Sequence, residues 1–114
     1  MASVTLPDEL AARVAPFGRW VPTVLEIGLL ALKTSAVETA GELVEFLTTN
    51  PSPREVHAYG ASERAQARMS RLLILNQAGA LGEAEVRELD ELIRLEHLVI
   101  TLKAGLSAAD LSAA

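Results

Sequence analysis

Hydrophobic side chains recur every three or four positions along most of the chain, which is the spacing of one face of an α-helix. Residues typical of helix N-termini divide this pattern into separate helices. Ser35 with Glu38 and Ser52 with Glu55 have the spacing of capping boxes, and Ser62 can cap a further helix. The pattern predicts helices over residues of about 7–16, 21–33, 35–50, 53–60, 62–78 and 83–104. A glycine-containing turn joins the last two, so we expect them to form an antiparallel hairpin.

Residues 2–6 depart from this helical period and alternate instead, with Val4 and Leu6 on one face and Ser3 and Thr5 on the other. Alternation of this kind predicts a short strand. A single strand cannot persist without a partner for its ladder groups, and the sequence holds no second strand signal. The simplest partner is the same segment of another copy.

The predicted helix over residues 21–33 is apolar on all sides, with only Glu26 and Lys33 charged. No single neighbouring surface can cover such a helix. Leaving four of its side chains in water would forfeit roughly 6–12 kcal/mol, at ~1.5–3 kcal/mol each, which is comparable with the whole stability of a typical domain. We therefore expect a dimer or a tight complex with another protein. The side chains assigned to dimerisation are Val4, Leu6, Val24, Leu25, Ile27 and Leu29.

Composition supports a helical protein of one unit. At 114 residues the chain can form one compact core but not two. Ala and Leu dominate while aromatic residues are few, and this balance favours packed helices over sheets. The net charge of −5 argues against broad affinity for nucleic acid, because such affinity comes from neutralising phosphates with Lys and Arg. The expected fold class is mainly α: a short N-terminal strand, then helices in a dimeric assembly that ends in the antiparallel hairpin.

Targeting signals are weak. Asp8 and Glu9 precede any apolar stretch and no basic segment comes before them, which is unlike a secretory signal. The longest apolar run, Trp20–Leu32, is interrupted by Pro22 and Glu26 and falls short of the about 20 residues needed to span a bilayer. We expect a cytoplasmic protein that does not enter a membrane.

The sequence offers few candidates for catalytic or metal-binding residues. The chain has no cysteine, and its two histidines, His57 and His97, lie far apart without a second metal-ligand type at i, i+4 spacing. No nucleophile elbow or phosphate-binding glycine loop occurs. His97 shares a helical face with Val86, Ile93 and Ile100, which favours a packed or interface histidine. The sequence therefore predicts neither an enzyme nor a bound metal or cofactor.

Charged residues form two groups in the predicted hairpin. Arg64, Arg68 and Arg71 follow i, i+4, i+7 spacing and make one basic stripe, while residues 83–91 are rich in Asp and Glu. In an antiparallel hairpin the stripe should sit at the open end and the acids near the turn, so the two groups should not neutralise each other easily. Either both are solvated faces, or the stripe docks on an acidic partner.

The same hairpin is apolar in more than one direction. Ile74 and Leu75 extend an apolar run that fills most sides of the first helix, and residues 98–102 do the same near the end of the second. Part of this surface would belong to a second copy or another protein, because large exposed apolar patches are rare on soluble monomers. Ordinary packing inside the chain is the competing interpretation.

Two stretches carry a family resemblance. The opening Val4-Thr5-Leu6-Pro7-Asp8-Glu9-Leu10 is similar to a ribbon-helix-helix start. The second stretch consists of Pro51-Ser52-Pro53-Arg54-Glu55-Val56, Ser62-Glu63, Gln66, Arg68, Leu72-Leu73, Asn76, Gly79, Leu81, Glu88-Leu89-Asp90-Glu91 and Leu95-Glu96-His97-Leu98. About half of the chain is covered, and it resembles bacterial antitoxins of the VapB-type group, which pair with PIN-domain ribonuclease toxins.

The resemblance implies a division of labour. Residues 1–34 would form a ribbon-helix-helix-like dimerisation segment, residues 35–106 a helical region that covers the toxin, and residues 107–114 a frayed tail. The surface for the partner is placed on Arg64, Arg68, Arg71, Ile74 and Leu75, whose arginines suit a cluster of metal-binding acids in a toxin.

DNA contact is a separate implication. Ser3 and Thr5 would enter a DNA groove, but no Lys or Arg accompanies them, so the resemblance is compatible with DNA binding or with its loss. The leading expectation is an antitoxin-like protein that binds and neutralises or scaffolds a cognate enzyme. The alternatives are a self-assembling helical adaptor and a ribbon-helix-helix repressor.

Overall fold

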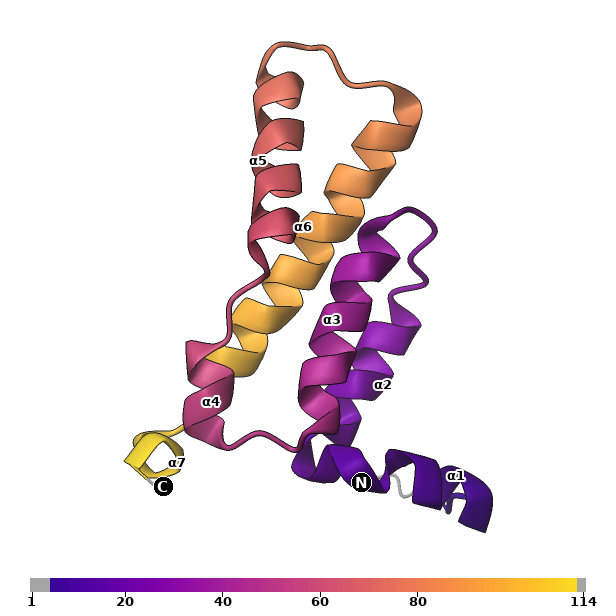
Figure 1. Ribbon diagram of the computed structural model, residues 1–114, viewed down its shortest axis with the longest axis vertical. Coiled ribbons are helices and arrows are strands. Elements are labelled where there is room, and N and C mark those ends of the chain that lie inside the picture. The colour runs from indigo at the N-terminus through magenta and orange to yellow at the C-terminus, as the bar shows by residue number, and fades with distance from the viewer. Residues whose placement is uncertain (1–4, 113–114) are drawn as a thin grey trace.

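The computed structural model of the chain describes residues 5–112, which fold into a set of helices joined by short connections (Figure 1). The elements in chain order are α1 (Asp8–Val14), the 3₁₀ helix η1 (Ala15–Trp20), α2 (Val21–Leu29), α3 (Ala36–Thr48), α4 (Pro53–Ala58), α5 (Glu63–Gln77), α6 (Glu83–Ala104) and α7 (Ala108–Ser112). The mainly α class and the C-terminal hairpin are confirmed.

The predicted N-terminal strand is wrong. Between residues 5 and 112 the structure contains no strand, and Thr5 and Leu6 lie in an irregular segment directly before α1. Ser3 and Val4 lie outside the described residues. A single period-2 segment has no ladder partner within one chain, and the helix that starts at Asp8 leaves only a short stretch before it. The strand pattern was therefore too short to decide the local structure.

The long helix α6 is the centre of the fold. α5 runs antiparallel to it on one side, and α3 and α2 pack on it from the other (Figure 1). Leu92, Leu95 and Leu98 point from α6 into the core, where they meet the buried residues of the other helices. The buried members of that core outside α6 are Trp20, Ile27, Ala36, Ala40, Leu43, Leu47, Val56 and Leu72.

Two helix boundaries differ from expectation in the connection between α2 and α3. The second helix ends at Leu29, not Lys33, and Ala31 takes the left-handed conformation with φ of 52°. The third helix starts at Ala36, but Ser35 makes no capping hydrogen bond with its side chain. Instead, the Ala36 amide donates to the Thr34 hydroxyl at 3.1 Å, so the capping box predicted at Ser35 does not form.

A carboxylate from α6 completes this connection. Glu91 is buried, and its oxygens accept hydrogen bonds from the Lys33 amide at 3.0 Å, the Thr34 amide at 3.1 Å and the Thr34 hydroxyl at 2.8 Å. Burial raises the pKa of Glu91, but the hydrogen bonds from Thr34 and Lys33 outweigh it and hold the pKa below its usual value. One side chain thus satisfies backbone donors that the α2–α3 connection cannot satisfy itself.

The junction between η1 and the α3–α4 connection is the second long-range link. The Trp20 indole is buried and donates to the Pro51 carbonyl at 2.8 Å. Gly18 has φ of 56°, and a β-carbon there would stand 2.4 Å from the side-chain oxygen of Asn50. The positive φ favours glycine at this position, and the missing side chain leaves the space that Asn50 occupies.

The remaining caps follow the sequence. Ser52 and Glu55 form the predicted capping box of α4, and the Ser62 hydroxyl accepts from the Ala65 amide at the start of α5. Where the sequence suggested a frayed tail, the structure has the short helix α7, with hydrogen bonds between Ser107 and Asp110 at its start.

Candidate protein-binding surfaces

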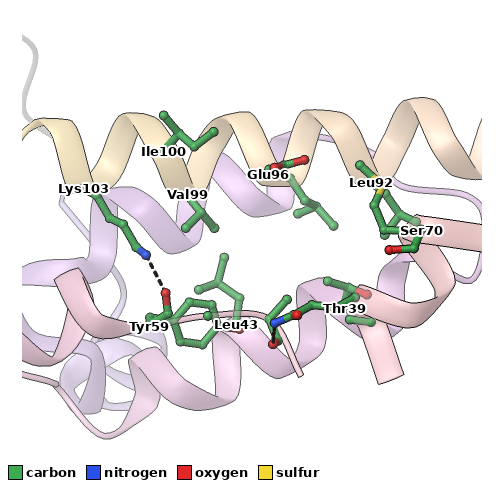
Figure 2. Close-up of a pocket in the computed structure, with 15 residues that line it drawn as sticks. Thr39, Leu43, Tyr59, Ser70, Leu92, Glu96, Val99, Ile100 and Lys103 are labelled. Atoms are coloured by element: carbon green, nitrogen blue, oxygen red, sulfur yellow. Dashed lines mark hydrogen bonds between the residues drawn. The ribbon is translucent and has the colours of Figure 1, made fainter. Parts of the chain in front are cut away.

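An open cleft of about 450 Å³ lies where α3, α5, α6 and the connection before α5 meet (Figure 2). Its lining is mainly apolar and includes Leu43 from α3, Met69 from α5, Leu92 and Val99 from α6, and the ring of Tyr59. α6 packs against both α3 and α5, so its side chains between them form one wall of the cleft. The volume lies within the range of known ligand and side-chain pockets.

Lys103 marks one end of the cleft. Its ammonium donates a hydrogen bond to the Tyr59 carbonyl, and the Tyr59 ring packs on Phe46 with centroids 4.6 Å apart. Burial, with a smaller contribution from Glu42, raises the pKa of the Tyr59 hydroxyl. Figure 2 shows Val99 and Lys103 reaching from α6 toward Tyr59, whereas Ile100 projects from the other side of the helix.

The chemistry that the cleft offers is that of a binding site. Its ionisable side chains are Tyr59, Glu96 and Lys103, of which Lys103 is held by a backbone carbonyl. The apolar wall can take up hydrophobic side chains, and a lysine at its edge can bind a carboxylate. Sequence reasoning missed this cleft, because it depends on where α3 stops relative to α5 and not on any local motif.

The arginine stripe is divided among different environments. Arg64 pairs with Glu38 at 3.0 Å, and both side chains are exposed. Arg68 donates two hydrogen bonds of 2.8 Å each to the buried carboxylate of Glu88. Arg71 is exposed and lines a shallow depression between α3 and α5.

The expectation that stripe and acids would not neutralise each other is therefore wrong for Arg68 and Glu88. The two residues are offset by about one turn across the hairpin, and the long arginine side chain spans that offset. The Arg68 hydrogen bonds lower the pKa of Glu88 against the opposing effect of burial, and they raise the pKa of Arg68. This pair holds α5 to α6.

Other predicted interface residues fall into buried and exposed groups. Ile27 is in the core and Val24 packs against it, whereas Leu25 is exposed and Leu29 is 82% exposed. α2 packs on η1, α3 and α6, but Ile27 is the one residue of this helix that these contacts bury. Leu6 is also exposed, and Val4 and Ser3 lie outside the described range.

On α5 the two apolar candidates separate in the same way. Ile74 is exposed and Leu75 is half-buried. Ile74 and Arg71 are three residues apart, so they lie on one exposed face of α5. These two residues are the part of the predicted partner surface that is not already engaged inside the chain.

The outer face of α6, on which the sequence placed His97 with Val86, Ile93 and Ile100, is a second exposed surface. Val86, Ile93 and Ile100 are 52%, 45% and 56% exposed, and His97 lies exposed among them. His97 is therefore not packed within this chain. The sequence grouped these residues on one helical face, and the seven-residue spacing of the three large apolar side chains is a further signal of an interface there.

Comparisons with known proteins give no further assignment. No family model matches the sequence, and neither the curated proteins nor the solved structures contain a match. Over residues 5–112, no group of three or more His, Cys, Asp or Glu side chains is placed to hold a metal ion. In the same range, no helix combines the length and apolar character that a membrane crossing requires.

Proposed function

We propose that this chain is a protein-binding subunit that neutralises or scaffolds a cognate enzyme, in the manner of an antitoxin. The observation that carries the proposal is the open apolar cleft, because exposed hydrophobic concavities of this size are typical of sites where a partner inserts side chains. The similarity of residues 51–98 to antitoxin tails is the reason for naming an enzyme as the partner.

Two features favour an acidic partner. Lys103 lies at the edge of the cleft, Arg71 lines the separate depression between α3 and α5, and neither is among the ion pairs of the described chain. A partner with carboxylates beside an apolar side chain would match both cations and the cleft. The proposal places this meeting in the cytoplasm.

DNA binding is not part of the proposal. It rested on a strand that would carry Ser3 and Thr5 into a DNA groove, and no strand forms between residues 5 and 112. Thr5 lies in the irregular segment before α1.

The test is co-expression with the protein encoded by the adjacent gene, for which a PIN-domain ribonuclease is the expected product. That protein alone should arrest growth, and this chain should restore growth and copurify with it in a fixed ratio. Gln66→Trp, which fills the cleft from α5, should weaken both effects by more than about 10-fold.

The matched control is Ala84→Trp, which adds the same ring to an exposed position of α6 outside the cleft. The control should rescue growth as the unchanged chain does. If the neighbouring protein does not bind, or if both tryptophan variants rescue equally, the proposed function is wrong.

A further inference from the structure

The outer face of α6 carries a stripe with the spacing of a coiled-coil seam. Its positions alternate in steps of four and three residues, which keeps them on one face of the helix over five turns. All of them are exposed. The outer stripe consists of Val86, Asp90, Ile93, His97, Ile100 and Ala104.

The large apolar members of the outer stripe occupy equivalent places in successive heptads. Val86, Ile93 and Ile100 are each about half exposed. The core of the chain lies on the opposite side of α6, where Leu92, Leu95 and Leu98 are buried. The outer stripe is therefore additional to the surface that α6 needs for its own fold.

We infer that the outer stripe is a homodimer interface in which α6 of a second copy packs antiparallel, with Ile93 at the two-fold axis. Val86 and Ile100 each lie seven residues from Ile93, so antiparallel pairing places Val86 opposite Ile100 of the second copy. Asp90 lies three residues before Ile93 and His97 four residues after it, so they meet with an offset of about 1.5 Å along the axis.

The positions of Asp90 and His97 favour antiparallel pairing of the two α6 helices over parallel pairing. Antiparallel pairing brings the Asp90 carboxylate to the His97 ring of the second copy, where an imidazole N–H can donate to it. Parallel pairing would set Asp90 against Asp90 and His97 against His97. Arg94 does not obstruct the seam, because its guanidinium donates to the Leu30 carbonyl beside α2.

The inference goes beyond the proposed function and does not depend on it. The outer stripe and the cleft share only Ile100 among their residues, so a dimer leaves the rest of the cleft open to another protein. It also differs from the dimer predicted through α2, a helix whose exposed large apolar residues are Leu25 and Leu29.

Light scattering on the purified chain tests the partner. The 114-residue chain has a mass of 12.1 kDa, and its particle in solution should have twice that mass at micromolar concentration. Ile93→Glu should weaken dimerisation by more than about 100-fold, because it places two carboxylates at the centre of the interface. Leu29→Glu, an equally polar change at a more exposed leucine, should leave the dimer intact.

Cysteine crosslinking tests the orientation and does not depend on how Ile93→Glu folds. The natural chain has no cysteine, so Val86→Cys and Ile100→Cys each provide a single thiol. Oxidising a mixture of the two variants should join one of each, whereas either variant alone should stay mostly uncrosslinked. A monomeric wild-type chain, a dimer lost only in Leu29→Glu, or efficient crosslinking of Val86→Cys with itself would each overturn the inference.

Discussion

Replacing Arg68 by methionine should lower the free energy of unfolding more than the same change at Arg64, because the Arg68–Glu88 pair is partly buried and the Arg64–Glu38 pair is exposed. The Arg68 and Glu88 side chains are 41% and 8% exposed, so the substitution leaves a buried carboxylate without its two strongest donors. Hydrogen bonds to charged groups contribute about 1.5–3 kcal/mol, and breaking a fully buried pair costs about 3–5 kcal/mol. Because Arg68 is partly solvated, water can reach the vacated site, and we expect a loss of about 2 kcal/mol.

Arg64→Met is the matched control. It removes the same guanidinium one turn earlier on α5, where Arg64 and Glu38 are 83% and 61% exposed. Exposed pairs of this kind contribute about 0–1 kcal/mol, so the control should change stability by less than half as much. Urea unfolding followed by circular dichroism measures both changes as differences in midpoint at constant slope.

The difference should also depend on pH. The pKa of Glu88 in the folded chain lies below its ordinary value of 4.5, so the stability that the pair contributes is present above that value and is lost as pH falls through the folded pKa. The difference in free energy of unfolding between wild type and Arg68→Met should therefore become smaller at acidic pH. Equal losses for the two arginine variants, or a gap that widens in acid, would show that the Arg68–Glu88 pair does not hold the hairpin.

Three further changes test other links in the fold. Gly18→Ala should destabilise the chain by about 1–3 kcal/mol in thermal unfolding, since an L-residue is strained at that backbone angle and the Asn50 side chain must move aside for its β-carbon. Trp20→Phe should cost about 1–3 kcal/mol in urea unfolding, because it leaves the Pro51 carbonyl without its donor. Glu91→Gln keeps the shape but removes the charge; it should cost about 1–3 kcal/mol and speed amide hydrogen exchange in the α2–α3 connection. No change in exchange there would contradict the capping role.

Most of the helices could be predicted because nearby residues determine where each one begins and ends. Ser52, Glu55 and Ser62 form caps that depend on residues only three positions away, and the structure has the hydrogen bonds that these spacings imply. The hairpin of α5 and α6 follows from two apolar periodic segments around a short turn. These are the features on which a single sequence carries most information.

The features that the sequence did not predict have a common physical cause: each depends on contacts between residues far apart in the chain. Ser35 and Glu38 have the spacing of a capping box, but Glu91 supplies the hydrogen bonds at this loop from far along the chain. On α2, the packing of α3 and α6 buries Ile27 and leaves Leu25 and Leu29 exposed, a division that the all-round apolar pattern of this helix does not contain. The cleft and the outer stripe depend on which faces remain uncovered after packing, and helical periodicity alone does not determine that.

The cap that Glu91 provides has a consequence for how the protein is made. Lys33 and the carboxylate that accepts its amide are 58 residues apart, so a ribosome that adds about 5–20 residues per second delivers the acceptor roughly 3–12 s after the donor. During that interval α2 and α3 of the nascent chain can pack against each other, but the amides of Lys33 and Thr34 in the connection between them stay hydrated. The α2–α3 connection can therefore reach its native hydrogen bonding only after α6 has emerged.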